Sequence, residues 1–453
     1  MKNWDVVKDN GYELFQKLLS EKKNLIFKKI ILDKKDNHKY PIENIPFNIP
    51  RNWYWCYLSD ISIIQEGPGI RKHQYQDEGV QFLTVTNILE DAIDLEKSKK
   101  YISVSEYDKT YSHFTINKGD IVTACSGGSW GKSAIFEFDD RLILNTSTLR
   151  LRFYDDLGNN RYLYYLTKTS YFKDSLSSYI TGQQPNYGYS HYSKIPIPLP
   201  PLSEQQHIVS ILEECFAAIE KAKANAEQNL KNAKELFDCV LESILYDKKW
   251  QVEQLGNVCE KVEYGTSSKA KPQGELPVLR MGNIHNGRFV WNSLVYSDNE
   301  EDNKQYLLKH NDVLFNRTNS PELVGKTAIY KGEQPAIFAG YLIRIHRKEN
   351  LLDADYLNYY LNSKMAFEYG KTVVISSVNQ ANINGTKLKT YPIPLPTIQE
   401  QQAIVRQLDA LRAETKKLEA VYQKKIDDLE ELKKSILQKA FAGELTTKEV
   451  VMA

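Results

Sequence analysis

The sequence has few cysteines and histidines, and neither type is arranged as a metal site. The five cysteines, which are Cys56, Cys125, Cys215, Cys239 and Cys259, never form a close pair and are odd in number. We therefore expect reduced thiols, with neither a disulfide framework nor a zinc site. None of the eight histidines stands in an HxxxH or HxH pattern, which also argues against a bound metal.

Signals for membranes and export are missing too. No stretch approaches the ~18 apolar residues of a membrane span, and the first ten residues, MKNWDVVKDN, carry charges where a signal peptide carries an apolar run. We expect a cytoplasmic protein that does not enter a membrane. Lysine plus arginine (59) nearly equals aspartate plus glutamate (58), so any DNA binding must use local basic patches.

The chain does contain an internal repeat. The segment IPIPLPPLSEQQHIV from Ile195 matches YPIPLPTIQEQQAIV from Tyr391 at an offset of 196 residues. The further matches are VTNI from Val85 with MGNI from Met281, QPN from Gln184 with QAN from Gln380, GKSAIF from Gly131 with GKTAIY from Gly325, and Asp120-Ile121-Val122 with Asp312-Val313-Leu314. The 453 residues therefore hold two copies of one unit, each a domain followed by a helix.

A proline-rich segment separates the domain from the helix in each copy. Four prolines between residues 196 and 201 fix φ and remove amide donors, which predicts an extended, stiff strut. Ser203 with Gln206, and Thr397 with Glu400, have the spacing of a capping box at the start of a helix.

After each strut, apolar residues recur with a spacing of 3.5 residues over five heptads. In copy one they are Ile208, Leu212, Cys215, Ile219, Ala222, Ala226, Ala233, Leu236 and Val240; in copy two they are Ile404, Leu408, Leu411, Thr415, Leu418, Tyr422, Leu429, Leu432 and Ile436. Asn229 and Lys425 interrupt the two seams. Small residues in one seam face bulky residues in the other, which predicts an antiparallel coiled coil between the two helices. Two independent surface helices are the alternative.

The rest of each copy is typical of a β-rich domain. Segments such as QFLTVTNI, GDIVTAC and LILNTSTLRLRF are short, β-branched or aromatic, and separated by Gly, Asn, Asp and Ser. Helical segments follow late in each copy, at residues 162–176 and 356–370. The predicted fold class is α+β, with two β-rich domains in tandem joined by two long helices.

The struts, the helices behind them and the C-terminal LKKSILQKAFAGEL resemble the specificity subunit of type I restriction-modification enzymes over nearly the whole chain. The resemblance implies two target-recognition domains that each bind one half of a split, asymmetric double-stranded DNA target, with helix length setting the gap. It implies no cofactor in this chain. Two methyltransferase subunits would bind S-adenosylmethionine, and restriction/translocase subunits would use ATP and magnesium. The resemblance implies these boundaries: an N-terminal helical or basic arm (1–44), recognition domain 1 (45–201), a central spacer helix (202–246), recognition domain 2 (247–396), and a C-terminal spacer helix with tail (397–453).

The N-terminal segment departs from the usual order. Residues 11–44 resemble the linker that follows AFAGEL in the middle of such chains. This suggests a circular arrangement in which an N-terminal helix completes the spacer bundle near the C-terminus. A solvated basic arm is the alternative.

Catalytic motifs are incomplete in this sequence. GKS at Gly131 and GKT at Gly325 lack the first glycine of a phosphate-binding loop and are followed by AIF or AIY, which predicts a strand where that motif needs a helix. No Asn/Asp-Pro-Pro-aromatic loop of an amino-methyltransferase is present. We expect a DNA-recognition subunit without catalytic activity.

Base edges are read by Arg, Lys, Asn and Gln, and phosphates are held by Lys, Ser, Thr and backbone amides. Two loops carry such residues: loop 1, CSGGSWGK at residues 125–132, and loop 2, NRTNSPELVGK at residues 316–326. Two amide-rich strips precede the struts: strip 1, TGQQPNYG at residues 181–188, and strip 2, SSVNQANING at residues 376–385. The candidate DNA-binding residues in the loops and strips are Ser129, Lys132, Gln183, Gln184, Asn186, Arg317, Asn319, Ser320, Lys326, Asn379, Gln380 and Asn382; earlier loops add Arg71, Lys72, Arg280, Asn283 and Arg288.

Individual roles differ within this set. We expect Arg317 to contact a base, and Lys132 and Lys326 to contact phosphates. Gln184 and Gln380 could read adenine, whereas Asn186 and Asn382 could instead cap turns that brace the struts, and the loops could be plain solvated turns.

Two other functions remain compatible with the sequence. One is a stand-alone DNA-binding or scaffold protein with the same two-domain layout, and the other is a catalytic protein with an unrecognised motif. Co-purification with a methyltransferase homodimer distinguishes the specificity subunit from the stand-alone protein.

Overall fold

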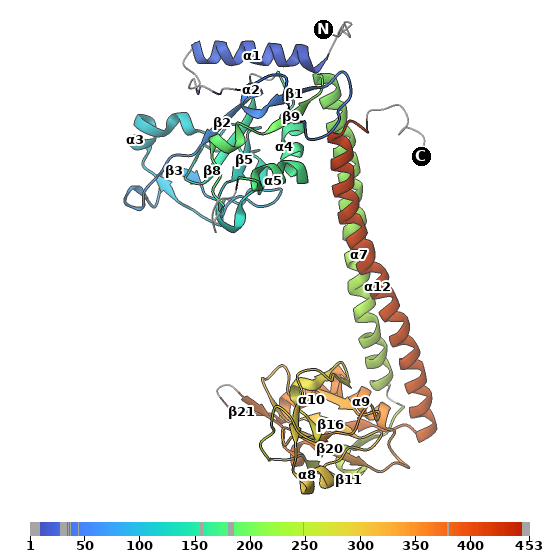
Figure 1. Ribbon diagram of the computed structural model, residues 1–453. Helices are drawn as coiled ribbons and strands as arrows, with labels where there is room; N and C mark the ends of the chain where they lie inside the picture. Colours follow the sequence, from blue (N-terminus) through green and yellow to red (C-terminus); the bar gives the residue numbers. More distant parts are fainter. Residues whose placement is uncertain are drawn as a thin grey trace. The chain divides into compact units, whose positions relative to one another are not determined.

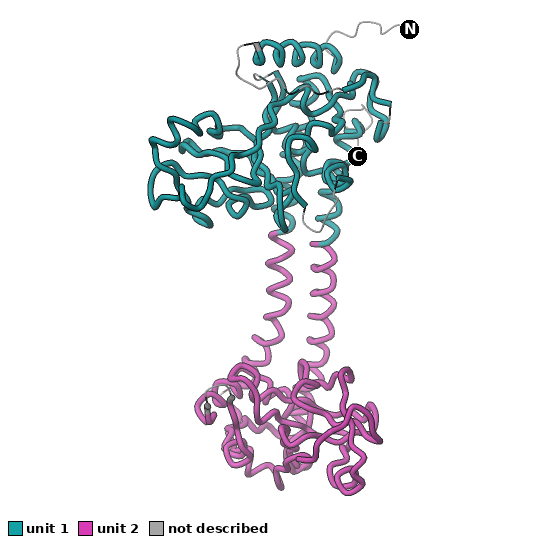
Figure 2. Tube along the Cα trace, turned by 60° about the vertical axis from the view of Figure 1, so that its left-hand side comes forward, with its two compact units in different colours: residues 1–223, 427–453 teal, residues 224–426 magenta. Residues whose placement is uncertain are grey.

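The chain divides into two compact units, which Figure 2 colours separately. The computed structural model describes residues 10–27, 34, 36, 38–43, 45–154, 157–179, 185–247, 249–377 and 380–445. Unit 1 comprises residues 1–223 and 427–453, and unit 2 comprises residues 224–426. Each unit therefore contains one β-rich domain and one part of each long helix.

The two domains repeat the same sheets, which confirms the internal repeat. Unit 1 has the strands β1 (Tyr54–Tyr57), β2 (Ser62–Glu66), β3 (Val80–Leu83), β4 (Tyr101–Ile102), β5 (Ile121–Ala124), β6 (Ser133–Ile135), β7 (Leu142–Leu144), β8 (Thr148–Phe153) and β9 (Pro196–Leu199). Unit 2 has β10 (Val252–Gln254), β11 (Cys259–Tyr264), β12 (Leu276–Leu279), β13 (Ile284–His285), β14 (Arg288–Phe289), β15 (Val295–Ser297), β16 (Val313–Asn316), β17 (Thr318–Asn319), β18 (Thr327–Ile329), β19 (Ile337–Phe338), β20 (Leu342–Arg347), β21 (Ile375–Ser377), β22 (Gln380–Asn382) and β23 (Pro392–Pro394). The sheet β2-β8-β5-β6 corresponds to β11-β20-β16-β18, and β4-β3-β7 corresponds to β15-β12-β19 with the same parallel pair.

Short helices complete each domain (Figure 1). They are α2 (Leu58–Ile61), α3 (Val104–Glu106), α4 (Asn160–Lys168), α5 (Ser170–Ser177) and α6 (Tyr189–Tyr192) in unit 1, and α8 (Glu300–Gln305), α9 (Ala354–Leu361), α10 (Lys364–Val373) and α11 (Gly385–Leu388) in unit 2. The helices predicted at residues 162–176 and 356–370 are thus confirmed, each as two consecutive helices. The predicted α+β class is confirmed as well.

An ion pair explains why an aspartate precedes β5 and β16, which are equivalent inner strands of the two four-stranded sheets. The Asp120 carboxylate is fully buried and lies 3.1 Å from an Arg150 guanidinium nitrogen on β8. Its counterpart Asp312 lies 3.0 Å from Arg344 on β20. The two pairs connect neighbouring strands in the same way, so these acids are structural.

The proline struts are strands, and each is fixed by a buried glutamine. β9 pairs antiparallel with β1, and β23 pairs antiparallel with β10. Gln205 is fully buried and donates from Nε2 to the Pro200 carbonyl at 3.0 Å. Gln401 does the same to Pro396 at 2.8 Å. The glutamine of the repeated EQ pair therefore ties the first turn of the long helix to the strut.

The long helices start differently in the two copies. α12 (Ile398–Phe441) begins after Thr397, whose backbone N–H donates to the Glu400 carboxylate at 2.9 Å, so the predicted capping box is confirmed there. α7 (Leu202–Leu245) begins one residue before Ser203, so the prediction of Ser203 as N-cap is wrong. Pro201 precedes the first helical residue instead, and proline is compatible with a helix start because it has no N–H to satisfy.

α7 and α12 pair in antiparallel orientation within each unit (Figures 1 and 2). In unit 1, Lys433 lies 5.2 Å from the ring centroid of Phe216, and Lys223 forms a 2.8 Å ion pair with Glu430. In unit 2, Arg412 lies 4.5 Å from the ring of Phe237. Phe237 lies 21 residues after Phe216 on α7, whereas Arg412 lies 21 residues before Lys433 on α12. The two contacts therefore run in opposite directions along the two helices. The predicted coiled-coil pairing is therefore confirmed, and the alternative of independent surface helices is wrong.

The seam between the helices follows a longer period than predicted. Leu236, Leu418 and Leu432, which the heptad pattern placed in the seam, are 40–47% exposed. Phe237 takes the seam position predicted for Leu236 and is half-buried. Ile426 is buried, whereas the pattern had placed the polar Lys425 in the seam as an interruption. The buried positions thus drift by one residue along each helix, as expected when the spacing is 3.6 residues, the period of a straight helix.

The N-terminal helix is part of the unit 1 core. α1 (Gly11–Phe27) packs on α2, β1 and β9, and it buries Leu14, Phe15 and Leu18. The alternative of a solvated arm is therefore wrong for this helix. Its buried face shares one core cluster with Leu437 and Phe441 near the end of α12.

A glycine ends α12 where the chain passes close to the N-terminal half of unit 1. Gly443 has φ of +78°, a left-handed conformation that favours glycine after a helix. A Cβ atom at this position would lie 2.2 Å from the Pro50 ring. This close approach accounts for the glycine in the AFAGEL motif.

Candidate nucleic-acid interface

Loop 1 and strip 1 lie side by side in unit 1. The Tyr187 N–H donates to the Cys125 carbonyl at 2.9 Å, and the Gly127 N–H donates to the Pro185 carbonyl at 3.2 Å. Ser126 and Asn186 form an isolated antiparallel bridge between these bonds. Asn186 is therefore held beside the loop with its side chain exposed. Gln183 and Gln184 lie outside the described residues.

Loop 2 and strip 2 repeat this arrangement in unit 2. β17 pairs antiparallel with β22, with Thr318 opposite Asn382. The Ile383 N–H donates to the Arg317 carbonyl at 2.9 Å, which is the equivalent of the Tyr187–Cys125 bond. Asn382 donates from Nδ2 to Thr318 Oγ1 at 3.0 Å, so this amide braces the loop. Asn379 and the side chain of Gln380 lie outside the described residues.

Among the basic side chains of loops 1 and 2, Arg317 is the one held in place by contacts with other described residues. Its guanidinium lies 4.9 Å from the ring centroid of Tyr264 and donates from one terminal nitrogen to the Gly340 carbonyl at 3.3 Å. Tyr264, at the end of β11, is 41% exposed, and its hydroxyl accepts a 2.8 Å hydrogen bond from the Gly385 N–H. Stacking on a fixed aromatic ring restricts the arginine rotamers, so the planar donor fork is oriented before any ligand arrives. Tyr264 lies 53 residues before Arg317, so no local sequence pattern connects the two residues.

The two lysines that we predict to contact phosphates form no ion pair with the described residues. Lys132 and Lys326 are half-buried, and within the described part of the chain neither has an ion-pair partner. Lys326 lines a groove of about 700 Å³ that is bounded by α7, α12 and the loop after β13. Ser129 is half-buried in loop 1, and Asn319 accepts the Ser320 N–H at 2.9 Å in loop 2.

Asn283 has a structural role that argues against base reading. It is 3% exposed; its Oδ1 accepts the Arg280 N–H, and its Nδ2 donates to the Val290 and Asn292 carbonyls, each at 3.1 Å. Asn87, its counterpart in VTNI, is fully buried and bonded in the same pattern. The repeated asparagine therefore closes the same turn in both domains.

The other early candidates vary in how far they are engaged. Arg280 donates to the Ser293 carbonyl at 3.1 Å, and Arg288 lies 3.6 Å from the Asp355 carboxylate in the same groove as Lys326. Arg71 and Lys72 are exposed at the start of a short turn in unit 1. Only the last two are fully available to an approaching duplex.

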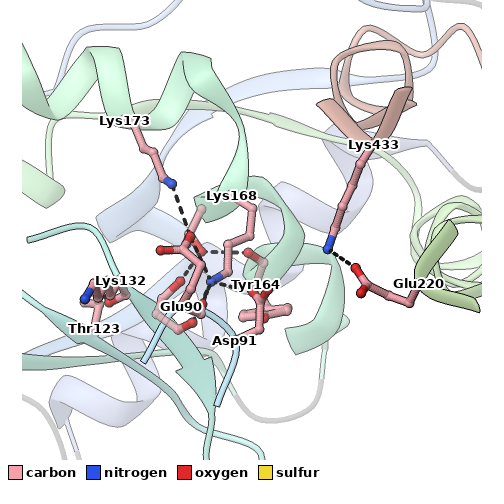
Figure 3. Close-up of polar contacts among 11 residues, drawn as sticks. Glu90, Asp91, Thr123, Lys132, Tyr164, Lys168, Lys173, Glu220 and Lys433 are labelled. Atoms are coloured by element: carbon pink, nitrogen blue, oxygen red, sulfur yellow. Dashed lines mark hydrogen bonds and ion pairs between the residues drawn. The ribbon is translucent and has the colours of Figure 1, made fainter. Parts of the chain in front are cut away.

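A buried lysine in unit 1 resembles a catalytic group but has a structural counterpart. Lys168 donates to the Ser133 carbonyl at 2.6 Å and lies 2.8 Å from the Asp91 carboxylate (Figure 3). Burial lowers the pKa of this ammonium group. At the equivalent position in unit 2, Asn362 donates to the Thr327 carbonyl at 3.0 Å. In both units this hydrogen bond connects the end of a helix, α4 or α9, to the first residue of a strand, β6 or β18. Because the Asn362 amide forms the same bond as the Lys168 ammonium group, the bond is structural.

Metal-binding clusters and membrane-spanning helices are both absent from the described residues. No group of three His, Cys, Asp or Glu side chains in that part of the chain could hold a metal ion. None of its helices is long and apolar enough to cross a membrane. The segments after GKS and GKT are the strands β6 and β18, so the predicted absence of a helix there is confirmed.

Comparison with known proteins agrees with this architecture. The StySPI specificity subunit of Salmonella potsdam and the EcoKI specificity subunit of Escherichia coli K12, both from type I restriction enzymes, are each 28% identical over 429 residues, covering 88% of this chain and 90% of theirs. A solved chain of a type I restriction-modification system has a TM-score of 0.68 at 21% identity, and covers 88% of this chain and 100% of its own. The HsdS subunit of Thermoanaerobacter tengcongensis has a TM-score of 0.60 at 21% identity, with 88% and 99% covered. These two structures share the fold.

A family model decides the assignment. The model for the type I restriction modification DNA specificity domain matches residues 50–228 and again residues 247–428, which is most of the chain. Each match contains one β-rich domain and its strut. The chain belongs to the family of type I restriction-modification DNA specificity proteins and carries two copies of the family's domain.

Proposed function

We propose that the chain is the DNA specificity subunit of a type I restriction-modification system, in which each domain binds one half of a bipartite, asymmetric target. The observation that carries the proposal is the repeat itself. Both domains use one scaffold and hold a loop against a strip with equivalent hydrogen bonds, but the residues displayed differ. Two similar scaffolds with unlike side chains suit two different half-sites.

In unit 2, we assign base reading to Arg317. Its planar guanidinium can donate two parallel hydrogen bonds to the O6 and N7 acceptors of guanine. Asn319, Ser320 and Lys326 surround it in sequence and suit contacts to phosphates or to a neighbouring base. Asn382 supports the loop through Thr318.

In unit 1, the chemistry is different at the matching position. Cys125 is the counterpart of Arg317, so a base-reading arginine is not available there. Ser129, Lys132 and Asn186 are the candidate residues of loop 1 and strip 1 that the structure describes, and Arg71 and Lys72 are exposed in the same unit. We infer that reading in this half depends more on amide and hydroxyl groups.

We assign the chemistry of the system to partner subunits. Two methyltransferase subunits would bind S-adenosylmethionine, and restriction/translocase subunits would use ATP and magnesium. This cytoplasmic chain would recognise the DNA sequence and set the spacing between the two half-sites. Leu418 and Val421 on α12 are 40% and 60% exposed and lie three residues apart, hence on one helix face. This exposed apolar pair is suited to a helix of a methyltransferase subunit.

The proposal is tested by expressing the chain with its methyltransferase in a host without restriction systems and sequencing the methylated bases of the genome. The expected result is methylation at one asymmetric motif made of two parts separated by unspecified bases. The methyltransferase alone is the control and should give no methylation. Methylation at a continuous motif, or without this chain, would overturn the proposal.

A further inference from the structure

Unit 2 contains an apolar cavity behind loop 2. Its volume is about 570 Å³, which is in the range of small-ligand sites. Pro321, Val324 and Gly325 of loop 2 form one wall, and Ala366 and Gly370 of α10 contribute another.

The internal repeat shows what would fill the same place. The Thr169 N-cap of α5 corresponds to the Ser363 N-cap of α10, which aligns the two late helices. Four positions that line the cavity carry larger side chains in unit 1: Trp130 for Val324, Phe172 for Ala366, Leu176 for Gly370 and Tyr187 for Ile383.

These larger side chains pack into the main core of unit 1. Phe172 and Leu176 are buried, and the Trp130 ring lies 5.2 Å from the ring of Tyr187. Unit 1 therefore closes with aromatic groups the space that unit 2 leaves open.

A tyrosine hydroxyl also lines the cavity. Tyr391 is 2% exposed and lines the cavity, and a Cβ atom built on Gly370 would lie 2.7 Å from its hydroxyl oxygen. The Tyr391 hydroxyl has no hydrogen-bond partner among the described residues. Its counterpart in unit 1 is Ile195, which has no polar atom to satisfy. The cavity therefore combines apolar walls with one hydroxyl that is available for a hydrogen bond to a ligand.

We propose that this cavity is a binding site for a flat, uncharged heteroaromatic ring system that hydrogen-bonds to the Tyr391 hydroxyl. Two charged residues, Glu322 and Lys371, also line the cavity, but both are exposed, and Lys371 is paired with Glu368 at 2.7 Å. The remaining lining is mainly apolar and favours an uncharged ligand. The aromatic groups that fill the equivalent space in unit 1 define the shape and chemistry that fit. The site requires no DNA, so it stands independently of the proposed function.

The test uses two probes of equal shape, indole and indene, which differ in one N–H group. Binding to the full chain is measured by calorimetry. Wild type should bind one indole per chain about tenfold more tightly than indene, because only indole pairs with the hydroxyl. Tyr391→Phe removes that hydroxyl and should bind indole no more tightly than indene. Equal affinity of wild type for both probes, or no saturable binding, would overturn the proposal.

Filling the cavity provides the second arm. Val324→Trp introduces the unit 1 residue and should abolish indole binding, and Ala366→Phe should do the same if the first variant does not fold. Leu323→Trp is the matched control, since Leu323 is 37% exposed and the added ring would lie outside the cavity. Undiminished indole binding by a folded Val324→Trp variant would place the probe elsewhere and refute the assignment.

Discussion

Replacing Arg317 with alanine should relax recognition of one half-site and leave the other half-site unchanged. Arg317 belongs to unit 2, and unit 1 has Cys125 at the equivalent position. The Arg317 guanidinium is held by the Tyr264 ring and the Gly340 carbonyl. The substitution removes a donor fork that is oriented in advance. Affinity for the correct base should therefore fall, and affinity for the other bases at that position should change little.

The expected size follows from the contacts. A bidentate contact between arginine and a base edge contributes about 1–3 kcal/mol of discrimination, which corresponds to about 5- to 150-fold in Kd. Because Tyr264 already restricts the side chain, less rotamer entropy is lost on binding, and the effect should lie in the upper half of this range. The same substitution removes a hydrogen bond worth about 1 kcal/mol from the fold, so unfolding of the variant must be measured alongside.

The assay is fluorescence anisotropy of the complex with methyltransferase, titrated onto duplexes that differ at single positions of the motif. Arg317→Lys keeps the charge but loses the planar fork, so it should behave like the alanine variant at the base and like wild type in its salt dependence. Lys326→Ala should weaken all duplexes equally and reduce the slope of log K against log salt by about 0.9. If Arg317→Ala also weakens every duplex equally, Arg317 contacts a phosphate and the reasoning is refuted.

Three further predictions concern the spacer, the docking surface and the response to acid. Deleting seven facing residues from both α7 and α12 shortens the pair by about 10 Å, or about 3 base pairs; methylome sequencing should show a shorter gap between unchanged half-sites, and altered half-site bases would contradict this. Val421→Glu should abolish co-purification with methyltransferase, whereas Ala420→Glu, which adds the same charge beside it, should not; equal loss in both would argue against an apolar docking face. Burial alone would raise the pKa of Glu263, but hydrogen bonds from His346 and Arg344 lower this pKa to about 2, below its usual 4.5. The ionised Glu263 therefore stabilises the fold above pH 4.5, and this stabilisation is lost as the pH falls from about 4.5 toward 2. Between pH 6 and pH 3 the unfolding temperature should fall more for wild type than for Glu263→Gln. Identical pH profiles of the unfolding temperature would exclude this stabilising role of Glu263.

The sequence predicted the elements of the fold better than their contacts. Repeats, struts and heptads are local patterns, so they identified the duplicated domains and the paired helices. The seam was one residue off in places because a strict heptad imposes 3.5 residues per turn, and the choice between Leu236 and Phe237 depends on the packing of both helices. Ser203 failed as a cap because the helix already begins at Leu202, directly after Pro201, which the capping pattern does not detect.

The candidate interface was predictable in composition but not in geometry. The loops and strips were found as polar segments, but their pairing joins residues about 60 positions apart, as in Thr318 with Asn382. Asn283 looked like a base reader because an asparagine in a polar loop has the same sequence signature whether its amide is free or buried. The Tyr264 platform depends on strand register across β11 and β20, which no local pattern specifies.

The interleaved composition of the two units has a consequence for biosynthesis. Unit 2 is one continuous stretch, so it can assemble on the ribosome once residue 426 has left the exit tunnel. Unit 1 needs Leu437, Ala440 and Phe441 from the last part of the chain to complete its core. Its first 223 residues must therefore wait, with apolar surface uncovered, until residue 441 has been synthesised. This nascent intermediate is the state in which chaperones would matter most.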